Sequence, residues 1–352
     1  MQQAGLRIES VGFGYYEGFT LLRSLRYWRE ARRGTAAGRE IFERRLHRLR
    51  HARLARPIRS LFGLLERFQP PGACCNPAHR CACVMIATIV VTWNQTELTL
   101  QCLTRLVETG FPQNQIWVVD NGSEPSAAPL LRERFPHTKI IRLDDNQGFA
   151  GGMNAGVSAA LLSRAQTLFL LNNDAMVEPQ TIPALQAALE EDSRIAAVSP
   201  KVYYDNTPHL IQSIGLRVDP NSGEARMLGS GEADCGQYDQ PADREALFGC
   251  AMLIRASAWE QVGPFWEPFF SYGEEIDWCL RARKQGWRLR YVPGAVVWHR
   301  TSSSLGADAP LKVYLMARNR LYLRSRHPPA GLAWLVWAGT GHLSQPARSQ
   351  YA

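Results

Sequence analysis

Short apolar runs alternate with helix-like patterns along the chain from Met85 onward. The runs are apolar at nearly every position, which is typical of strands buried on both faces of a parallel sheet. We expect strands at residues 86–91, 115–119, 139–143 and 167–171. Apolar residues spaced three and four apart predict helices at residues 97–108, 127–134, 152–163 and 179–190. Repeated strand–helix–strand units predict an α/β fold with a mostly parallel central sheet flanked by helices.

The chain before Met85 has a different character. Residues 1–84 hold 16 arginines, no lysine and 6 acidic residues, and residues 20–67 have the apolar spacing of Arg-rich helices. A junction without regular structure is expected at residues 68–84. This basic leader fits a helix on an anionic membrane, a solvated helix without a partner, or a start codon assigned too far upstream. We therefore expect a leader and linker at 1–84, a compact domain at 85–305 and a helical tail at 306–352.

The charge is concentrated in that leader. The whole chain has a formal net charge of +8 and the leader carries +10, which leaves −2 for the remaining residues. A nucleic-acid partner is therefore not expected for the compact domain. No run reaches the roughly 18–20 apolar residues that cross a bilayer, and the N-terminus lacks the apolar run of a signal peptide, so a cytoplasmic location is expected.

The tail contains a basic amphipathic pattern at residues 312–326. Such a helix can rest on the anionic inner face of the cell membrane, as a peripheral contact. Packing of the helix against the compact domain is the alternative.

Polar side chains follow the ends of the predicted strands. Thr92 and Asn94 follow the first strand, and Asp120 and Asn121 follow the second. Such residues often form turns or helix caps. However, the carboxyl ends of parallel strands share one edge of a sheet, and ligands bind at that edge. Their placement therefore indicates a site for a nucleotide base and ribose.

A glycine-rich run at residues 146–156 follows the third strand. Gly148, Gly151 and Gly152 would let the backbone pass close to a ligand. The run leads into a helix, whose N-terminus favours an anion such as diphosphate. It matches neither a Walker loop nor a dinucleotide-binding fingerprint.

A carboxylate follows the fourth strand. Asp174 lies two residues after Asn172 at the predicted strand end. Hard cations such as Mg²⁺ and Mn²⁺ take oxygen ligands and commonly share them with substrate phosphates. Asp174 is therefore a candidate metal ligand, with a helix cap as the alternative.

Further acidic residues and a histidine come later in the chain. Glu274, Glu275 and Asp277 open an amphipathic helix after an aromatic stretch. An apolar environment can raise a carboxylate pKa toward the range of a general base, although acidic residues also stabilise any helix N-terminus. His299 ends another predicted strand.

In this order the motifs resemble glycosyltransferase family 2, and in particular its rhamnosyltransferase-like and galactofuranosyltransferase-like branch. The resemblance covers about residues 85–326, and residues 1–84 have no counterpart in it. The stretches that carry it are residues 91–94, 118–123, 146–154, 171–174, 248–255, 274–277 and 298–299.

The resemblance implies the GT-A nucleotide-diphospho-sugar transferase fold and inversion of the transferred sugar in a single displacement. By matching position, Thr92, Asn94 and Asp120 would bind the nucleoside, and Asn154 and the glycine run would lie against the donor. Asn121 and Asn172 complete the set of donor-binding candidates.

The resemblance also implies the catalytic machinery. Asp174 and His299 would hold a divalent metal, Mg²⁺ or Mn²⁺, and Asn172 stands where the motif has its first acidic position. Glu275 occupies the place of the family's usual aspartate base, and Asp277 or Glu274 could substitute for it.

The expected function is therefore transfer of a sugar from a nucleotide-diphosphate donor, dTDP-rhamnose-like or a UDP-sugar, to a hydroxyl of a glycan or lipid-linked acceptor in cell-surface polysaccharide synthesis. A catalytically degenerate nucleotide-sugar-binding module is the alternative. A processive polysaccharide synthase is disfavoured, because the chain lacks the Gln-x-x-Arg-Trp signature and transmembrane helices.

Overall fold

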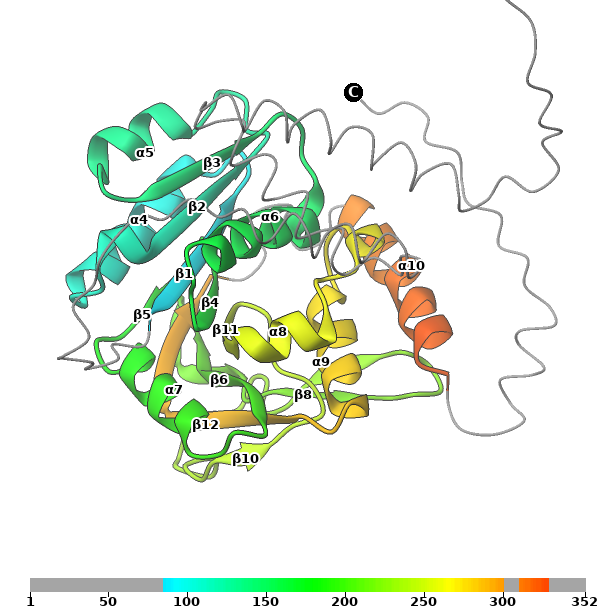
Figure 1. The fold of residues 1–352 in the computed structure, drawn as a ribbon. Coiled ribbons are helices and arrows are strands. Elements are labelled where there is room, and N and C mark those ends of the chain that lie inside the picture. Colours follow the sequence, from blue (N-terminus) through cyan, green and yellow to red (C-terminus); the bar gives the residue numbers. More distant parts are fainter. Residues whose placement is uncertain (1–84, 301–309, 329–352) are drawn as a thin grey trace, which may run out of the picture. The chain divides into compact units, whose positions relative to one another are not determined.

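The computed structural model describes residues 85–300 and 310–328. Their main feature is a ten-stranded mixed sheet with the order β10-β12-β6-β11-β4-β1-β2-β3, in which β5 also pairs with β12 and β7 with β6 (Figure 1). The strands are β1 Ile86–Thr92, β2 Ile116–Asn121, β3 Lys139–Leu143, β4 Thr167–Asn172, β5 Ala175–Val177, β6 Ile195–Tyr204, β7 Thr207–Ser213, β10 Ala242–Asp243, β11 Ala251–Arg255 and β12 Arg288–His299, and a separate pair is β8 Leu216–Val218 with β9 Ala225–Met227. The helices are α4 Thr96–Glu108, α5 Ala128–Arg134, α6 Gly148–Leu162, α7 Thr181–Glu190, α8 Ala256–Val262, α9 Glu274–Lys284 and α10 Pro310–Arg326, with 3₁₀ turns η1 Gln113–Gln115 and η2 Glu267–Phe269.

The first half of the sheet confirms the predicted α/β architecture. β3, β2, β1 and β4 are parallel neighbours, and each predicted strand is found within two residues of its expected bounds. Alternate residues of β1 face opposite layers: Ile89 packs with the α6 side, and Val90 packs with α4, α5 and α7. Both faces of β1, β2 and β4 are therefore covered, which is why their sequences are apolar at nearly every position, while the edge strand β3 is only partly buried.

The second half of the sheet is not parallel throughout, so the expectation of a mostly parallel sheet holds only for its first half. β11 runs antiparallel to both of its neighbours, β4 and β6. β12 returns parallel to β6, while β5 and β10 pair with it in the antiparallel sense. An apolar run indicates burial but not strand direction, and the connections here are not the repeated crossovers seen in the first half.

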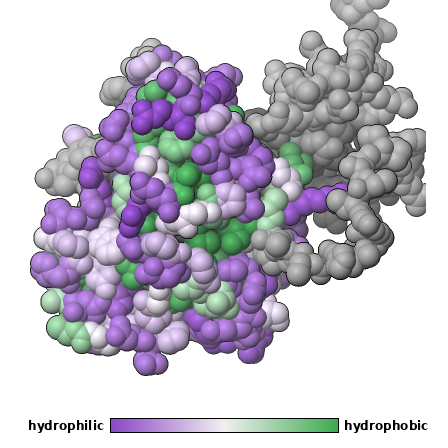
Figure 2. Space-filling view, turned by 90° about the vertical axis from the view of Figure 1, so that its left-hand side faces the viewer, coloured by the Kyte–Doolittle hydropathy of each residue, from purple (hydrophilic) through white to green (hydrophobic). Residues whose placement is uncertain are grey.

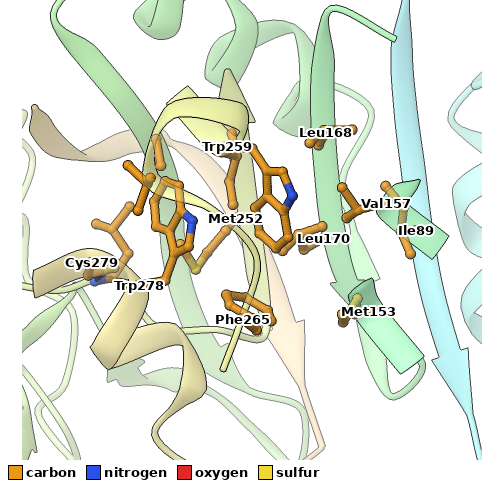
Figure 3. Close-up of a cluster of buried hydrophobic side chains, with 14 of the residues drawn as sticks. Ile89, Met153, Val157, Leu168, Leu170, Met252, Trp259, Phe265, Trp278 and Cys279 are labelled. Carbon is orange, nitrogen blue, oxygen red and sulfur yellow. Dashed lines mark hydrogen bonds between the residues drawn. The ribbon is translucent and has the colours of Figure 1, made fainter. Parts of the chain in front are cut away.

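Large aromatic side chains fill the core on the α6 side of the sheet (Figure 3). Trp259 of α8 stacks on Trp278 of α9 with ring centroids 5.9 Å apart, and it meets the edge of Phe265 at 5.0 Å. Trp278 is fully buried, and its indole N–H donates to the carbonyl of Gly263 at 3.0 Å. This cluster fixes α9, and with it the acidic helix start, against the sheet.

Helix α6 begins at Gly148, four residues before the predicted start, so the glycine run forms its first turns. A Cβ atom on Gly156 would lie 2.4 Å from Ile89 Cγ2, and one on Gly152 would lie 2.8 Å from Val91 Cγ1. These glycines therefore let α6 approach β1 more closely than any other residue would allow.

Helix α10 packs against the rest of the described residues through one face. Leu315, Asn319 and Leu323 are its buried residues, and α10 lies beside α9 (Figure 1). The predicted alternative for this segment, packing against the compact domain, is therefore confirmed for that face. The leader at 1–84 and residues 329–352 of the predicted tail lie outside the described residues.

None of the helices within 85–300 and 310–328 is long and apolar enough to span a membrane. The face shown in Figure 2 is mainly hydrophilic, with hydrophobic residues reaching the surface chiefly in a band near its centre.

Candidate active site

The predicted metal ligands meet at the end of the central strands. β4 ends at Asn172, and Asp174 lies two residues farther on, just before β5. β12 ends at His299, which pairs with Ala175 across the sheet. The His299 Nε2 atom lies 3.2 Å from Asp174 Oδ1 and 3.3 Å from Asn172 Nδ2. Three residues from two distant parts of the chain therefore converge as the sequence motifs predict.

The other ring nitrogen of His299 is held by Gln212. His299 Nδ1 lies 3.0 Å from Gln212 Oε1, and both side chains are buried. Because an amide oxygen can only accept, Nδ1 donates to Gln212, and Nε2 is the ring nitrogen that lies toward Asp174 and Asn172. The Phe248 ring meets the imidazole edge-on at 5.6 Å. Such outer contacts are typical of a metal-binding histidine.

The residues present fit a divalent cation. Asp174 supplies a carboxylate and His299 an imidazole, and the buried Oδ1 of Asn172 has no hydrogen-bond partner among the described residues. Within those residues no group of three or more His, Cys, Asp or Glu side chains is placed to hold a metal ion. The remaining ligands would therefore come from substrate phosphates or water, as is usual for Mg²⁺.

Glu275 lies in the first turn of α9. Its Oε2 accepts from the Gly273 amide at 3.2 Å, and Gly249 packs against its side chain. The residue is only partly exposed, and burial raises the pKa of its carboxyl above the usual range. A raised pKa makes a carboxylate a better proton acceptor, so the environment suits a general base.

Cys250 connects Glu275 to the metal-binding residues. Its carbonyl accepts from the Asn172 amide at 2.8 Å. Burial raises the pKa of its thiol, and the charges of both Asp174 and Glu275 raise it further. The 248–250 segment therefore contacts both groups of residues: Phe248 meets His299, the Cys250 carbonyl accepts from Asn172, and Gly249 packs against Glu275.

Asp277 does not fit the predicted role of substitute base. It is fully buried, and its oxygens accept from Arg281 Nε at 2.8 Å, Arg326 Nε at 2.7 Å and His327 Nε2 at 2.8 Å. Burial by itself would raise the pKa of this carboxyl, but the hydrogen bonds from His327 and Arg326 and the charge of Arg281 lower it well below its usual range. A carboxylate held in this way is a weak proton acceptor.

Glu274 is a different case. Its side chain is 4% exposed, its Oε2 has no hydrogen-bond partner among the described residues, and burial followed by the charge of Glu275 raises its pKa. The two adjacent glutamates are therefore not both ionised readily. Because Glu275 is the more accessible, it stays the predicted base.

Two of the predicted nucleoside-binding side chains are occupied by protein partners. Asp120 is fully buried and accepts from the Ser123 and Ala127 amides and the Ser126 hydroxyl, and it forms an ion pair with Arg142 at 2.9 Å. Burial would raise its pKa, but these hydrogen bonds and the charge of Arg142 lower it.

The Asn121 side chain is likewise hydrogen-bonded to protein groups. It donates to Asn146 Oδ1 and the Gly148 carbonyl and accepts from the Gln147 amide. Both side chains hold the loops after β2 and β3 in place, and their contact with a donor stays a prediction.

The other two nucleoside-binding candidates lie at the same edge. Thr92 is buried, and its hydroxyl accepts from Thr99 at 2.8 Å. Asn94 is exposed with φ 54°, and its side-chain oxygen accepts from the Glu124 amide at 2.8 Å. Contact of Asn94 with a donor stays a prediction.

The start of α6 does not provide the predicted diphosphate site. The four amides that a helix N-terminus leaves open are all engaged by protein acceptors. The acceptors of the amides of residues 147–150 are, in order, Asn121 Oδ1, Asn146 Oδ1, Ser271 Oγ and the Phe270 carbonyl. Gly148, at φ 69°, would place a Cβ 2.3 Å from the Phe270 carbonyl oxygen. The glycines at 148, 151 and 152 therefore serve packing within the protein.

Asn154 has a structural role as well. Its side chain accepts from the Phe265 amide at 3.0 Å and donates to the Phe265 carbonyl at 2.9 Å. It holds the 265–267 segment in place and is 7% exposed. The prediction that it lies against the donor does not fit this arrangement.

Two functional contributors were not expected from the sequence. Gln212 orients His299, and Asn319 of α10 contacts the turn that precedes Glu275. Both are single polar residues in otherwise unremarkable stretches, and only their burial, at 1% and 2% exposed, distinguishes them.

Comparisons with known proteins agree with this arrangement. The family model described as "Glycosyltransferase like family 2" matches residues 84–322. The chain is 27% identical over 259 residues to an N-acetylglucosaminyl-diphospho-decaprenol L-rhamnosyltransferase of Mycobacterium tuberculosis, covering 65% of this chain and 80% of that protein. It is 27% identical over 212 residues to the low-salt glycan biosynthesis hexosyltransferase Agl10 of Haloferax volcanii, covering 58% of this chain and 64% of that protein.

A solved structure shares the fold. The crystal structure of GalNAc-T7 with UDP, GalNAc and Mn²⁺ superposes with a TM-score of 0.52 at 17% sequence identity, covering 67% of this chain and 48% of that one. At this identity the likeness supports the GT-A fold and nothing finer. The family model spans more than half of the chain, which confirms the predicted family. The chain belongs to glycosyltransferase-like family 2, and it is a glycosyltransferase with the GT-A fold.

Proposed function

We propose that this enzyme transfers a sugar from a nucleotide-diphosphate donor to an acceptor hydroxyl with inversion, using Asp174 and His299 as metal ligands and Glu275 as the base. The observation that carries the proposal is the 3.2 Å approach of His299 Nε2 to Asp174, together with the 248–250 segment, whose Phe248 meets His299 and whose Gly249 packs against Glu275 of α9. Support also comes from the Mn²⁺ present in the structurally similar GalNAc-T7.

The proposed residues divide the chemistry between them. When bound, a divalent ion at Asp174 and His299 would offset the negative charge that develops on the leaving nucleoside diphosphate. Glu275 accepts the proton of the acceptor hydroxyl as that oxygen attacks the anomeric carbon, and the bond to the diphosphate breaks. The Gly273 amide at 3.2 Å orients the carboxylate for this transfer.

The relatives indicate the substrate classes. One acts on N-acetylglucosaminyl-diphospho-decaprenol and transfers rhamnose, and another is a hexosyltransferase of glycan biosynthesis. We therefore propose a dTDP-rhamnose-like or UDP-sugar donor and a glycan or lipid-linked acceptor, with a role in cell-surface polysaccharide synthesis.

Turnover of purified full-length protein tests the proposal. Release of UDP or dTDP would be measured from dTDP-rhamnose, UDP-glucose and UDP-galactose, with Mn²⁺ or Mg²⁺ and a polyprenyl-diphosphate-linked N-acetylglucosamine. We expect Asp174→Asn and excess EDTA each to abolish release, and Glu275→Gln to lose about 10²–10⁴ in rate while still binding nucleotide. Glu133→Gln, an exposed change on α5, is the matched control.

Two results would contradict the proposal. Full activity of Asp174→Asn in EDTA would contradict the proposed role of a metal. A parent rate for Glu275→Gln would contradict the proposed role of Glu275 as the base. A protein that binds nucleotide sugar but releases no nucleoside diphosphate with any donor would be the degenerate binding module.

We further propose that α10 rests on an anionic membrane surface, where a lipid-linked acceptor would be found. Most of the large hydrophobic side chains exposed by the described residues belong to this helix: Leu311, Val313, Tyr314, Met316 and Leu321. At helical spacing Val313, Tyr314 and Leu321 share the face opposite the buried Leu315 and Leu323. The helix also carries five basic and no acidic residues, of which Arg318, Arg320 and Arg326 contact protein groups as well.

This composition matches an interfacial helix, whose apolar face enters the lipid while its cations meet anionic headgroups. Sedimentation with phosphatidylglycerol vesicles at low salt should capture the parent protein, and vesicles of phosphatidylcholine should capture less. Val313→Asp with Leu321→Asp should abolish capture, whereas Leu130→Asp, at an exposed hydrophobic position of α5, should not. Equal capture of all variants would refute this docking face.

A further inference from the structure

The turn that leads into the catalytic helix has a strained backbone. Phe270 has φ 64° and ψ −67°, and the Ser271 amide donates to the Phe269 carbonyl at 2.8 Å. These values define the rare γ-turn with positive φ, which is unfavourable for any residue with a side chain. Tyr272 follows at φ 72° and Gly273 at φ 99°. Glu275 lies two residues beyond this turn, so the turn sets where its carboxylate points.

A buried asparagine of α10 holds the turn from one side. Asn319 is 2% exposed, and its side-chain nitrogen lies 3.0 Å from the Phe269 carbonyl, 2.7 Å from that of Ser271 and 2.6 Å from that of Tyr272. Its oxygen accepts from Arg318 Nε at 2.9 Å, which fixes the orientation of the amide. One side chain therefore contacts three carbonyls of the strained turn.

The start of α6 holds the same turn from the other side. The Phe149 amide donates to Ser271 Oγ at 3.2 Å, and the Ala150 amide donates to the Phe270 carbonyl at 3.1 Å. The turn is thus fixed between α6 and α10. The α6 contacts come from a helix that is itself fixed to the sheet. From α10, Arg318 Nη2 also donates to the Pro268 and Phe269 carbonyls at 2.9 and 2.7 Å, but among these polar contacts only Asn319 reaches the Ser271 and Tyr272 carbonyls next to Glu275.

We infer that Asn319 is a positioning residue for Glu275: by donating to the Phe269, Ser271 and Tyr272 carbonyls it holds the strained turn in the conformation that orients the base. This inference rests on the proposed role of Glu275. Without the three hydrogen bonds, the turn relaxes toward ordinary backbone angles. The Gly273 amide then moves with the turn, and this amide is the donor to Glu275 Oε2. A displacement of about 1 Å at a reacting group can reduce a rate about 10²-fold.

A purely structural asparagine would behave differently. Its loss would lower the fraction of folded enzyme, and both turnover and nucleotide-binding stoichiometry would fall together. A positioning residue affects the chemical step and leaves the metal-binding side of the site intact, because Asp174 and His299 come from β4 and β12 and the strand pairs beside them.

The experiment compares Asn319→Ala, Asn319→Ser and Glu275→Gln, singly and in combination, in the full-length protein. Leu315→Ala, another buried change on the same face of α10, is the control for lost packing. Three quantities are measured: kcat with the turnover assay above, stoichiometry and Kd for UDP and dTDP with Mn²⁺ by calorimetry, and hydrogen exchange of the peptide covering residues 269–275.

We expect Asn319→Ala to lower kcat about 10- to 100-fold with nucleotide Kd and stoichiometry unchanged, and Asn319→Ser, which keeps one donor, to lie between it and the parent. Exchange at residues 269–275 should rise in Asn319→Ala but not in Leu315→Ala. In a Glu275→Gln background, Asn319→Ala should not lower kcat further, because its effect acts through the base.

Several outcomes would overturn the inference alone. These are a parent kcat for Asn319→Ala while Glu275→Gln is inactive, unchanged exchange at residues 269–275, or additive losses in the double variant. A parent rate for Glu275→Gln would instead contradict the proposed function, so the two failures are distinguishable.

Discussion

Replacing Asp277 with asparagine should destabilise the protein without removing a catalytic group. The change keeps the shape of the side chain but removes the negative charge with which Arg281, Arg326 and His327 pair among the described residues. Asp277 is fully buried, while Arg281 and Arg326 are 20% and 29% exposed. Arg326 also lies 4.2 Å over the Trp266 ring. Two guanidinium groups would therefore remain near each other without their shared carboxylate.

Breaking a buried ion pair by removing one partner typically costs about 3–5 kcal/mol, because the remaining charge is left uncompensated. For a domain of this size each kcal/mol lowers Tm by about 2–4 °C. Asp277→Asn should therefore lower Tm by roughly 6–20 °C. Because Arg326 and His327 belong to α10 or follow it directly, we expect α10 to loosen before the central sheet.

The effect should depend on pH in a defined direction. The ion pairs hold the folded pKa of Asp277 below its value in the unfolded chain. Its contribution to stability is then fully present above the unfolded pKa of about 3.9, and it is lost as pH falls from there through the folded pKa. The difference in unfolding free energy between parent and Asp277→Asn should be constant above about pH 5 and shrink below about pH 4.

Urea unfolding at several pH values, followed by tryptophan fluorescence, measures this difference. Glu224→Gln is the control, because its partners Arg226 and Arg320 are exposed, and it should change the midpoint little. Equal stability of Asp277→Asn and the parent at pH 7 would refute the reasoning. If Asp277→Asn kept the parent stability but lost turnover, Asp277 would be the base in place of Glu275.

Four other outcomes follow from the structure. Glu275→Asp should keep part of the activity in the turnover assay, because the carboxylate remains but is about 1.5 Å short, and parent activity would argue against a positioned base. Gln212→Ala should weaken Mn²⁺ activation by about 10- to 100-fold, measured as the Mn²⁺ concentration for half-maximal turnover, since His299 loses the contact that fixes its ring. Gly156→Ala should cost about 1–3 kcal/mol in urea unfolding, because the new Cβ lies 2.4 Å from Ile89 Cγ2, whereas Gly294→Ala meets nothing within 4 Å and should be neutral. Deletion of residues 1–84 should leave a folded protein that binds nucleotide, because the sheet begins at Ile86, and a molten product by near-UV circular dichroism would contradict this.

The sequence by itself determined the elements of the first half of the sheet and the three residues on which the proposed chemistry depends. Strands β1, β2 and β4 are buried on both faces, so their apolar runs are continuous and readable in one dimension, whereas the edge strand β3 is only partly buried. Asp174 could be chosen because it follows a strand at the edge where ligands bind, whereas the roles of Glu275 and His299 came from the resemblance of their motifs to the family. Local periodicity and position along a strand are properties of neighbouring residues, and a sequence records them directly.

Which polar residues are available to bind a ligand depended on the tertiary structure. Asp120, Asn121 and Asn154 have the residue types of a binding site, but each is satisfied by protein groups. The same holds for Asp277, whose partners Arg326 and His327 follow some 50 residues later. Neither these contacts nor the antiparallel direction of β11 leaves a periodic signal, because they depend on where distant segments meet. A buried polar group takes whichever partner the fold brings within about 3 Å, and that choice is made only when the chain has packed.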